Sequence, residues 1–187
     1  FQGEADTYTV EYTTDGQSIN LVYSDSTKGW LPLEDDVAAD EPAAPQTQKG
    51  IMAFGYSGGY VNTRNLINSS GVVAEDASGA GTGRETLAAA SYGLDKAIYA
   101  FGHDGGYVSM SNLVNNSGVV ATDVTGVGTA RTQLGAAEYG VDKAIFGYGT
   151  TGSIVSLSNL VSSSGVVASD VTGVGTARSG LAACSFN

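Results

Sequence analysis

The sequence predicts an all-β repeat protein, and three observations support that prediction. Among its 187 residues are 27 glycines, and Thr, Ser and Val are abundant, a composition that favours strands joined by tight turns. The motif Asn-Leu-Ile/Val recurs every 47 residues, at Asn65, Asn112 and Asn159. Within each recurrence, short apolar runs alternate with Gly-rich turn signals. We therefore expect a repeat domain over residues 50–187, made of units 50–96, 97–143 and 144–187.

Four short strands are expected in each unit. In the third unit they are predicted at residues 144–149, 154–161, 162–171 and 172–186. Apolar and polar residues alternate over 155–158, which predicts a strand with one buried face, whereas 144–148 is apolar on both faces and is predicted to be central. A unit of this length cannot bury both faces of a sheet alone, so we expect neighbouring units to stack.

The region before the repeats is predicted to be a small attachment module, residues 1–33. Residues 7–23 contain two strand-like runs around Asp15-Gly16, a strong signal for a β-hairpin. Residues 1–3 resemble the remnant of a protease-cleaved tag, so the natural segment is expected to begin near Glu4. Residues 34–48 are acidic and contain Ala and Pro, which is typical of a linker.

The charge distribution argues against several classes of partner. The formal net charge is −11, and ten of the nineteen acidic residues precede residue 46, where Lys28 is the only base. Without a Lys/Arg cluster, this balance predicts no nucleic-acid binding. No apolar run approaches the roughly 18 residues needed to cross a membrane, so no membrane insertion is expected. Cys184 is the single cysteine, so no internal disulfide is possible.

Several charged residues recur in every unit and are predicted to belong to the scaffold. An Asp precedes an Arg by eight residues each time, a spacing that suits an ion pair or a backbone hydrogen bond across a hairpin within the unit. A Lys also recurs at the start of each unit's first strand. These scaffold positions are Asp76, Arg84, Asp123, Arg131, Asp170, Arg178, Lys49, Lys96 and Lys143.

Positions that differ between units are the candidates for recognition, since shared positions usually carry packing. The largest differences lie in the first turn and second strand of each unit, where aromatic residues stand beside small polar ones. Such a mixture on exposed turns suits stacking on sugar rings or docking on a protein surface. The predicted ligand-binding residues are Tyr56, Tyr60, Arg64, His103, Asp104, Tyr107, Thr150 and Thr151.

Signals for catalysis are weak. His103 is the only histidine, and no Cys/His set matches a zinc site. The Gly-rich turns lack the Lys and following helix of phosphate-binding loops, and the Asp-bearing turns lack the calcium-loop pattern. The sequence therefore predicts no catalytic residue, no metal and no cofactor. A glycan-degrading enzyme would need a carboxylate pair, for which only Asp104 and Glu138 lie at unit-specific positions.

Taken together, the repeat motifs resemble a known group of proteins. The pattern KAIFGYG, VSLSNLV, GVVASDVTGVGTAR and LAACSFN is similar to the kelch-like repeats of virion structural and tail (fibre) proteins of marine bacteriophages, and INLVYSDSTKGW resembles a segment that precedes such repeats. The resemblance implies one β-propeller blade per unit and a place on a phage particle. Because a propeller ring usually needs four or more blades, two chains pooling six blades are one expectation; a β-trefoil or another β-stack, such as a solenoid or prism, is the alternative.

The expected function is therefore that of a non-enzymatic virion protein that recognises a host surface structure, a glycan or a protein, through its repeat turns. A purely structural, self-assembling virion component is the first alternative, and a tailspike-type glycan-degrading enzyme is the second. Expected partners are further copies of the chain in a homo-oligomer, other virion proteins and a host surface glycan. The expected location is the phage particle, with the isolated chain soluble.

Overall fold

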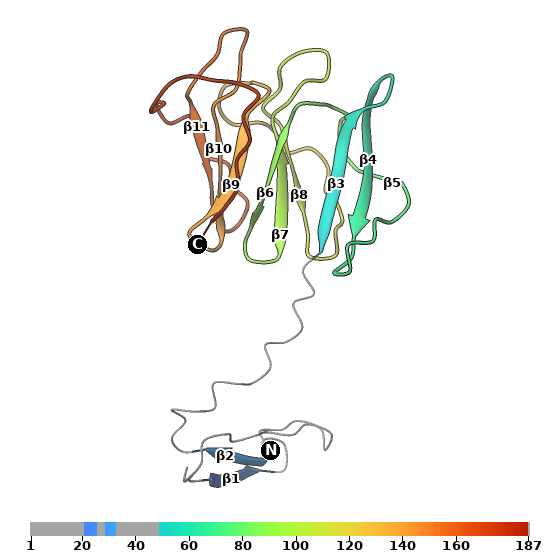
Figure 1. Ribbon diagram of the computed structural model, residues 1–187, viewed down its shortest axis with the longest axis vertical. Coiled ribbons are helices and arrows are strands. Elements are labelled where there is room, and N and C mark those ends of the chain that lie inside the picture. The colour runs from blue at the N-terminus through green and yellow to red at the C-terminus, as the bar shows by residue number, and fades with distance from the viewer. Residues whose placement is uncertain (1–20, 26–28, 33–48, 187) are drawn as a thin grey trace. The chain divides into compact units, whose positions relative to one another are not determined.

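The computed structural model describes residues 21–25, 29–32 and 49–186, and these residues form strands and turns without any helix (Figure 1). The prediction of an all-β protein is therefore confirmed. The chain divides into two compact units, residues 1–47 and 48–187. In the first unit, β1 (Leu21–Asp25) pairs antiparallel with β2 (Gly29–Pro32). The predicted turn at Asp15-Gly16, the tag remnant 1–3 and the linker 34–48 lie outside the described residues.

In the second unit, the described residues form three antiparallel sheets of three strands each. The first sheet contains β3 (Gly50–Tyr56), β4 (Tyr60–Ile67) and β5 (Ala77–Ser78), with β4 in the centre. The second contains β6 (Ala88–Tyr92), β7 (Lys96–Ala100) and β8 (Ser111–Val114), and the third contains β9 (Gly135–Tyr139), β10 (Lys143–Gly147) and β11 (Ser158–Val161). The central strands of these two sheets are β7 and β10. The three sheets stand side by side in chain order (Figure 1).

The sheets are offset from the sequence units. β6 belongs to the first sequence unit but pairs with β7 of the second, with Ala88 opposite Ala100 and Tyr92 opposite Lys96. β9 pairs in the same way with β10. The tight turns between these strands contain Leu94 and Val141, which have positive φ angles of 72° and 74°. Each boundary between sequence units therefore lies inside a sheet, and backbone hydrogen bonds connect the units.

The predicted four strands per unit are only partly present. In the second and third sheets, the third predicted strand is reduced to isolated bridges, from Val120 to Val114 and Val124 to Ser111 in the second sheet and from Val167 to Val161 and Val171 to Ser158 in the third. β11 begins at Ser158, later than the predicted start at residue 154, because the backbone N–H of Val155 donates to the carbonyl O of Gly149 (2.9 Å) in the preceding turn. Residues 172–186 contain no paired strand among the described residues.

The hydrophobic core lies between neighbouring sheets. Its main cluster joins the second and third sheets, where the rings of Phe101 and Phe146 meet edge to face at 5.6 Å. A smaller cluster joins the first and second sheets, where Phe54 meets Tyr99 at 5.3 Å. The hydroxyl of Tyr99 also donates to the carbonyl O of Ile51 (2.8 Å). Burial raises the pKa of Tyr99 to about 12. Each sheet is thus covered by its neighbour, as expected for stacked repeats.

Candidate functional site

Four of the predicted recognition residues lie together in the structure. Tyr56 ends β3 and Tyr60 begins β4, and their ring centroids are 5.7 Å apart. The ring of His103 lies 5.7 Å from Tyr60 and 5.9 Å from Tyr107. All three contacts are edge to face, a favourable arrangement for aromatic pairs. We call Tyr56, Tyr60, His103 and Tyr107 the aromatic row; it spans two sequence units.

Backbone pairing across two Gly-rich turns places these rings. Tyr56 pairs with Tyr60 across the turn 57–59, and His103 forms a bridge with Tyr107 across the turn 104–106. Gly58 and Gly105 have φ angles of 75° and 113°, which only glycine adopts without strain. A second bridge, from His103 to Glu85 at the end of the first unit, aligns the second turn with the first. Local turn chemistry and the contact between units therefore assemble the row together.

The aromatic row is open to solvent. Tyr56, Tyr60 and Tyr107 are 61%, 38% and 43% exposed. The hydroxyl of Tyr60 lies 3.0 Å from Nδ1 of His103, so the row combines aromatic surface with a polar pair. Exposed rings that are held by each other keep a fixed spacing at low entropic cost, which suits them to stack on a flat, partly apolar ligand such as a sugar ring.

The remaining predicted residues take other positions. Thr150 and Thr151 form the corresponding turn of the third unit, where the hydroxyl of Thr150 accepts from the N–H of Gly152 (3.2 Å) and that of Thr151 donates to the carbonyl O of Ser153 (3.4 Å). Asp104 is half-buried in the turn of the second unit, beside His103. Arg64 lies apart from the row, and its guanidinium donates to the carbonyl O of Gly118 (2.7 Å).

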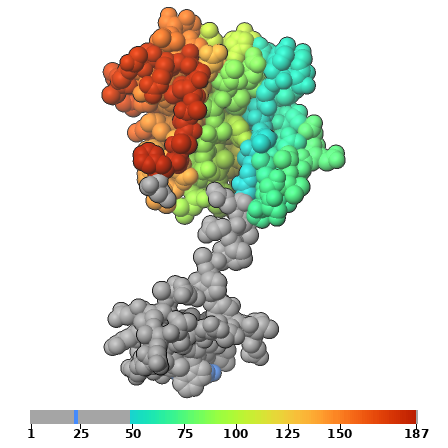
Figure 2. Space-filling view, viewed as in Figure 1, coloured from blue at the N-terminus to red at the C-terminus, as the bar shows by residue number. Residues whose placement is uncertain are grey.

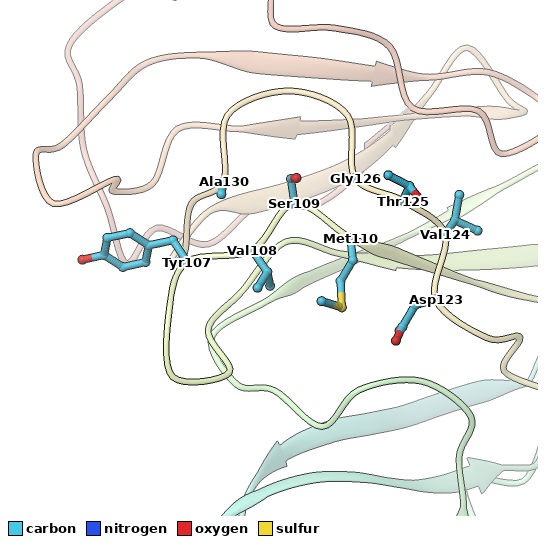
Figure 3. Close-up of a pocket in the computed structure, with 9 residues that line it drawn as sticks. All are labelled: Tyr107, Val108, Ser109, Met110, Asp123, Val124, Thr125, Gly126 and Ala130. Carbon is cyan, nitrogen blue, oxygen red and sulfur yellow. The ribbon is translucent and has the colours of Figure 1, made fainter.

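A pocket adjoins the aromatic row at Tyr107 (Figure 3). Its volume is about 420 Å³, within the range of small-ligand sites. Residues 107–110 and 123–126 line it together with Ala130. Figure 3 shows the ring of Tyr107 at the edge, pointing away from the other side chains. Apart from Tyr107, its lining was not predicted to bind ligand; all of these residues lie within residues 107–130 of the second unit.

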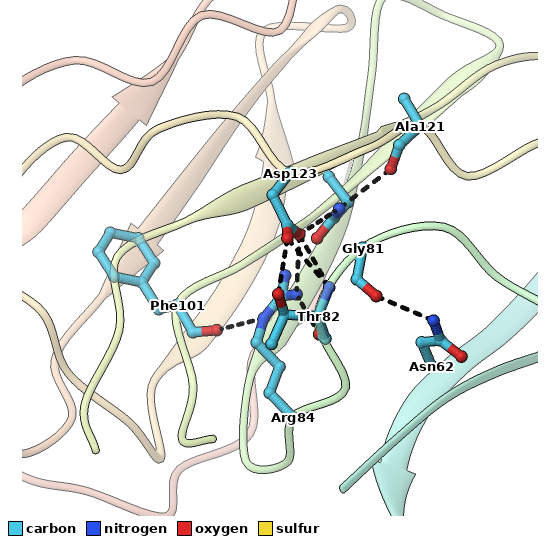
Figure 4. Close-up of polar contacts among 8 residues, drawn as sticks. Asn62, Gly81, Thr82, Arg84, Phe101, Ala121 and Asp123 are labelled. Atoms are coloured by element: carbon cyan, nitrogen blue, oxygen red, sulfur yellow. Dashed lines mark hydrogen bonds and ion pairs between the residues drawn. The ribbon is translucent and has the colours of Figure 1, made fainter. Parts of the chain in front are cut away.

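Two of the recurring Arg–Asp pairs form a second kind of arrangement, at the junctions between units; Figure 4 shows the first of them. Arg84 is fully buried, and its guanidinium stacks 4.4 Å above the ring of Phe54. Its Nε donates to the carbonyl O of Phe101 (2.8 Å), and it forms an ion pair with Asp123 of the next unit (3.9 Å). Burial lowers the pKa of Arg84 to about 10, opposed by the charge of Asp123, so the side chain stays cationic at neutral pH.

Asp123 is held from several sides. It accepts hydrogen bonds from the N–H of Thr82 (3.0 Å), the hydroxyl of Thr82 (2.7 Å) and Nδ2 of Asn112 (2.9 Å). Partial burial opposes ionisation of Asp123, but the bonds from Asn112 and Thr82 and the charge of Arg84 outweigh it and lower the pKa. The Asp and Arg therefore join two successive units, whereas the sequence spacing predicted a pair inside one unit.

The second junction repeats the first in each detail. Arg131 is fully buried, stacks 4.2 Å above Phe101, donates from Nε to the carbonyl O of Tyr148 (2.9 Å) and pairs with Asp170 (3.8 Å). Asp170 accepts from Thr129 and Asn159 as Asp123 does from Thr82 and Asn112. In a repeat of 47 residues, an Asp eight residues before one Arg is also 39 residues after the previous Arg. The sequence spacing therefore permits an Arg–Asp pair within one unit or between two units, and the stacking of the units selects the pair between units.

The recurring lysines lie at the turns between paired strands. Lys96 pairs with Asp95 (3.2 Å) and Lys143 with Asp142 (2.9 Å), and all four side chains are partly exposed. Lys49 is exposed just before β3. Such exposed pairs contribute little to stability, so these residues do not define a site.

Comparison with known proteins assigns no family. No protein-family model matches the chain, and no curated protein shows significant similarity to it. Within the part of the chain that the structure describes, no group of three or more His, Cys, Asp and Glu residues is placed to hold a metal ion. Over the same residues, no helix has the length and apolar character to span a membrane.

Proposed function

We propose that this chain is a virion surface protein of a bacteriophage whose repeat domain binds a host glycan through the aromatic row. The single observation that supports glycan recognition is the contiguous set of exposed rings at Tyr56, Tyr60, His103 and Tyr107. The virion location rests on the resemblance of the repeats to those of phage tail proteins. The proposed role is binding, with no catalytic step.

The row has the features that a sugar ligand requires. Its rings provide apolar faces and edges, and the Tyr60 hydroxyl and the His103 ring nitrogen provide hydrogen-bonding groups between them. The adjoining pocket at Tyr107 gives a second sugar unit a place beside the row, where Ser109 and Thr125 supply hydroxyl groups. A ligand longer than one sugar ring therefore suits the site better than a single ring.

We further propose that each sheet is one blade of a propeller-like assembly. The offset pairing of β6 with β7 and of β9 with β10 supports this, because the second and third sheets then each contain strands from two successive units, which ties neighbouring blades together. The variable turns of the first two units then lie together in the aromatic row. Many copies on one particle would raise a weak single-site affinity through multivalency.

Glycan-array binding tests the proposal. Tyr60→Ala and Tyr107→Ala should each weaken binding about tenfold, as expected for loss of a stacking ring. Tyr139→Ala is the matched control, since Tyr139 is similarly exposed at 39% but lies in β9, outside the row. Equal losses in all three variants, or no binding of the wild-type chain to any glycan, would contradict the proposal. Binding to host cells that survives removal of surface glycans would instead indicate a protein receptor.

A further inference from the structure

We infer that the chain associates head to tail with a second copy of itself, through a third instance of the junction that occurs twice within it. Arg178 of one copy would enter the socket formed by Asn65 and Asp76 of the other. The inference is independent of the proposed glycan recognition, because it uses none of the residues of the aromatic row.

The receiving socket is already built in the first unit. Nδ2 of Asn65 donates to the carbonyl O of Ala74 (3.1 Å) and to Oδ1 of Asp76 (2.8 Å). Asn112 makes the equivalent bonds at 3.0 and 2.9 Å, and Asn159 makes them at 3.0 and 3.0 Å. Those two sockets each receive an arginine from the preceding unit. Among the described residues, no arginine pairs with Asp76, and its side chain is exposed.

The segment that would enter this socket, residues 171–178, lies at the other end of the repeats. Residues 171–178 have the same sequence as residues 124–131, VTGVGTAR. The guanidinium of Arg178 stacks 4.1 Å above Tyr148, as that of Arg131 stacks on Phe101, and its carbonyl O accepts from Gly149 as that of Arg131 accepts from Gly102. Arg131 is buried against the next unit, whereas Arg178 is exposed. The exposed arginine and the exposed socket are complementary in charge.

The surroundings of Gly175 in this segment support the same inference. A Cβ at Gly128 would lie 2.4 Å from Oδ1 of Asp170, because the segment approaches the socket of the third unit closely. Gly81 is equally close to Asn112 and Asp123. At Gly175, the nearest atom to such a Cβ is the hydroxyl of Tyr148 at 3.6 Å. Asp76 of a second copy would stand against Gly175 as Asp170 stands against Gly128.

The sheet edges are complementary as well. β7 and β10 pair on both sides, whereas β3 pairs with β4 alone among the described strands. Residues 182–186 correspond in the repeat to β6 and β9, and the register of those strands would place Cys184 opposite Ile51 of the second copy. In the chain's own first unit this position falls on residues 41–45, which lie outside the described residues.

The C-terminal segment is positioned for that pairing. Ser185 is bonded to the backbone N and O of Glu138 through its hydroxyl (3.0 Å each), so residues 182–186 lie against β9. Figure 2 shows this segment, in red, on the surface. Phe186 is 92% exposed, whereas Tyr92 and Tyr139, at the equivalent positions, are 3% and 39% exposed. When each end of one copy contacts the opposite end of the other, a head-to-tail pair closes into a ring. The inferred assembly is such a closed dimer.

Light scattering at a series of chain concentrations tests this inference. The wild-type chain should have twice the mass of one chain and dissociate only on dilution. Arg178→Glu and Asp76→Lys should each raise the dissociation constant about tenfold or more, since each removes one partner of a charge pair that becomes buried. Glu75→Lys is the matched control for Asp76→Lys, because it changes the charge equally at the neighbouring exposed residue. A monomer at every concentration would overturn the inference. So would a dimer that neither Arg178→Glu nor Asp76→Lys weakens, or one that Glu75→Lys weakens as much as Asp76→Lys does.

A disulfide trap tests the register of the two copies. Across antiparallel strands, opposite Cα atoms are about 4.5–5.5 Å apart, which a disulfide can span. Ile51→Cys should therefore form a covalent dimer with native Cys184 under mild oxidation, whereas the exposed loop variant Val119→Cys should not exceed the wild-type background. Equal crosslinking in both variants would contradict the predicted register. Both experiments use the full chain, and neither depends on a glycan.

Discussion

The junctions between units and the aromatic row belong to the same repeat domain but follow opposite rules. At the junctions the same residue types recur in each unit, and Arg84 and Arg131 are completely buried. In the row the equivalent positions differ between units, and the tyrosines are exposed. A buried side chain is packed on all sides, so the same residue type is needed at the equivalent position of each unit. An exposed turn carries no such constraint and is free to present different chemistry in each unit.

Backbone strain also recurs at the junctions between units. Phe54, Phe101 and Tyr148, on which the arginines stack, all have positive φ angles near 65°, namely 66°, 64° and 65°. A bulky residue in this region is disfavoured, so surrounding contacts have to hold it there. The same conformation therefore recurs at each residue on which an arginine stacks, as positive φ angles also recur in the tight turns at Leu94 and Val141. The following predictions test this contrast.

The largest expected effect is on a buried arginine. Arg131→Ala should lower the free energy of unfolding by about 3 kcal/mol, because it leaves a cavity and an unpaired Asp170. Arg178→Ala, in an identical local sequence but exposed, should lower it by about 1 kcal/mol or less. Urea unfolding at concentrations where the chain is monomeric measures both. Equal effects would show that burial at the junction is not what distinguishes them.

A smaller effect is expected from glycines in the same pair of segments. Gly128→Ala should destabilise the protein by about 2 kcal/mol, since the new Cβ would clash with Asp170 and the φ of 83° is strained. Gly175→Ala introduces similar strain at a φ of 77° without the clash, and about 1 kcal/mol is expected. The two melting curves, recorded at low chain concentration, give the difference. If Gly175→Ala is the more damaging, the assignment of the clash is wrong.

Acid should weaken the junctions specifically. The pKa values of Asp123 and Asp170 are lowered in the folded state. Their stabilisation is therefore present above the unfolded value of about 3.9 and is lost as the pH falls through the lower folded values. Asp170→Asn should flatten the fall in unfolding free energy below pH 4. Identical slopes in the wild-type protein and this variant would contradict the assignment.

The smallest effect on stability is expected in the aromatic row. Tyr60→Ala removes two edge-to-face contacts at the surface and should change the free energy of unfolding by about 1 kcal/mol or less. The same variant should still lose glycan binding, so function and stability separate at this residue. A loss of stability comparable to that of Arg131→Ala would mean that the row is part of the core.

Much of this structure could be predicted from the sequence. The all-β class follows from composition, and the 47-residue period locates equivalent residues without a structure. Comparison between units also selected Tyr56, Tyr60, His103 and Tyr107, which the structure brings together. This succeeded because the four residues occupy corresponding turn positions, and stacked repeats place corresponding turns next to each other.

The partners of the recurring charges could not be predicted. An Asp within a unit and an Asp in the next unit satisfy the same sequence period, so only three-dimensional stacking decides that Arg84 meets Asp123. The strand count is confirmed only in part. Residues 162–171 look strand-like by composition, but in the third sheet they form only two isolated bridges, Val167 to Val161 and Val171 to Ser158.

The pairing of β6 with β7 and of β9 with β10 also bears on how such chains change in length. Because the second and third sheets each combine strands from two successive units in the same register, the two joints between units are alike. An insertion or deletion of 47 residues therefore preserves every register, whatever point of the period it starts from. Genetic duplication within the repeats can thus lengthen or shorten the array by one sheet at a time, without requiring a new interface to evolve.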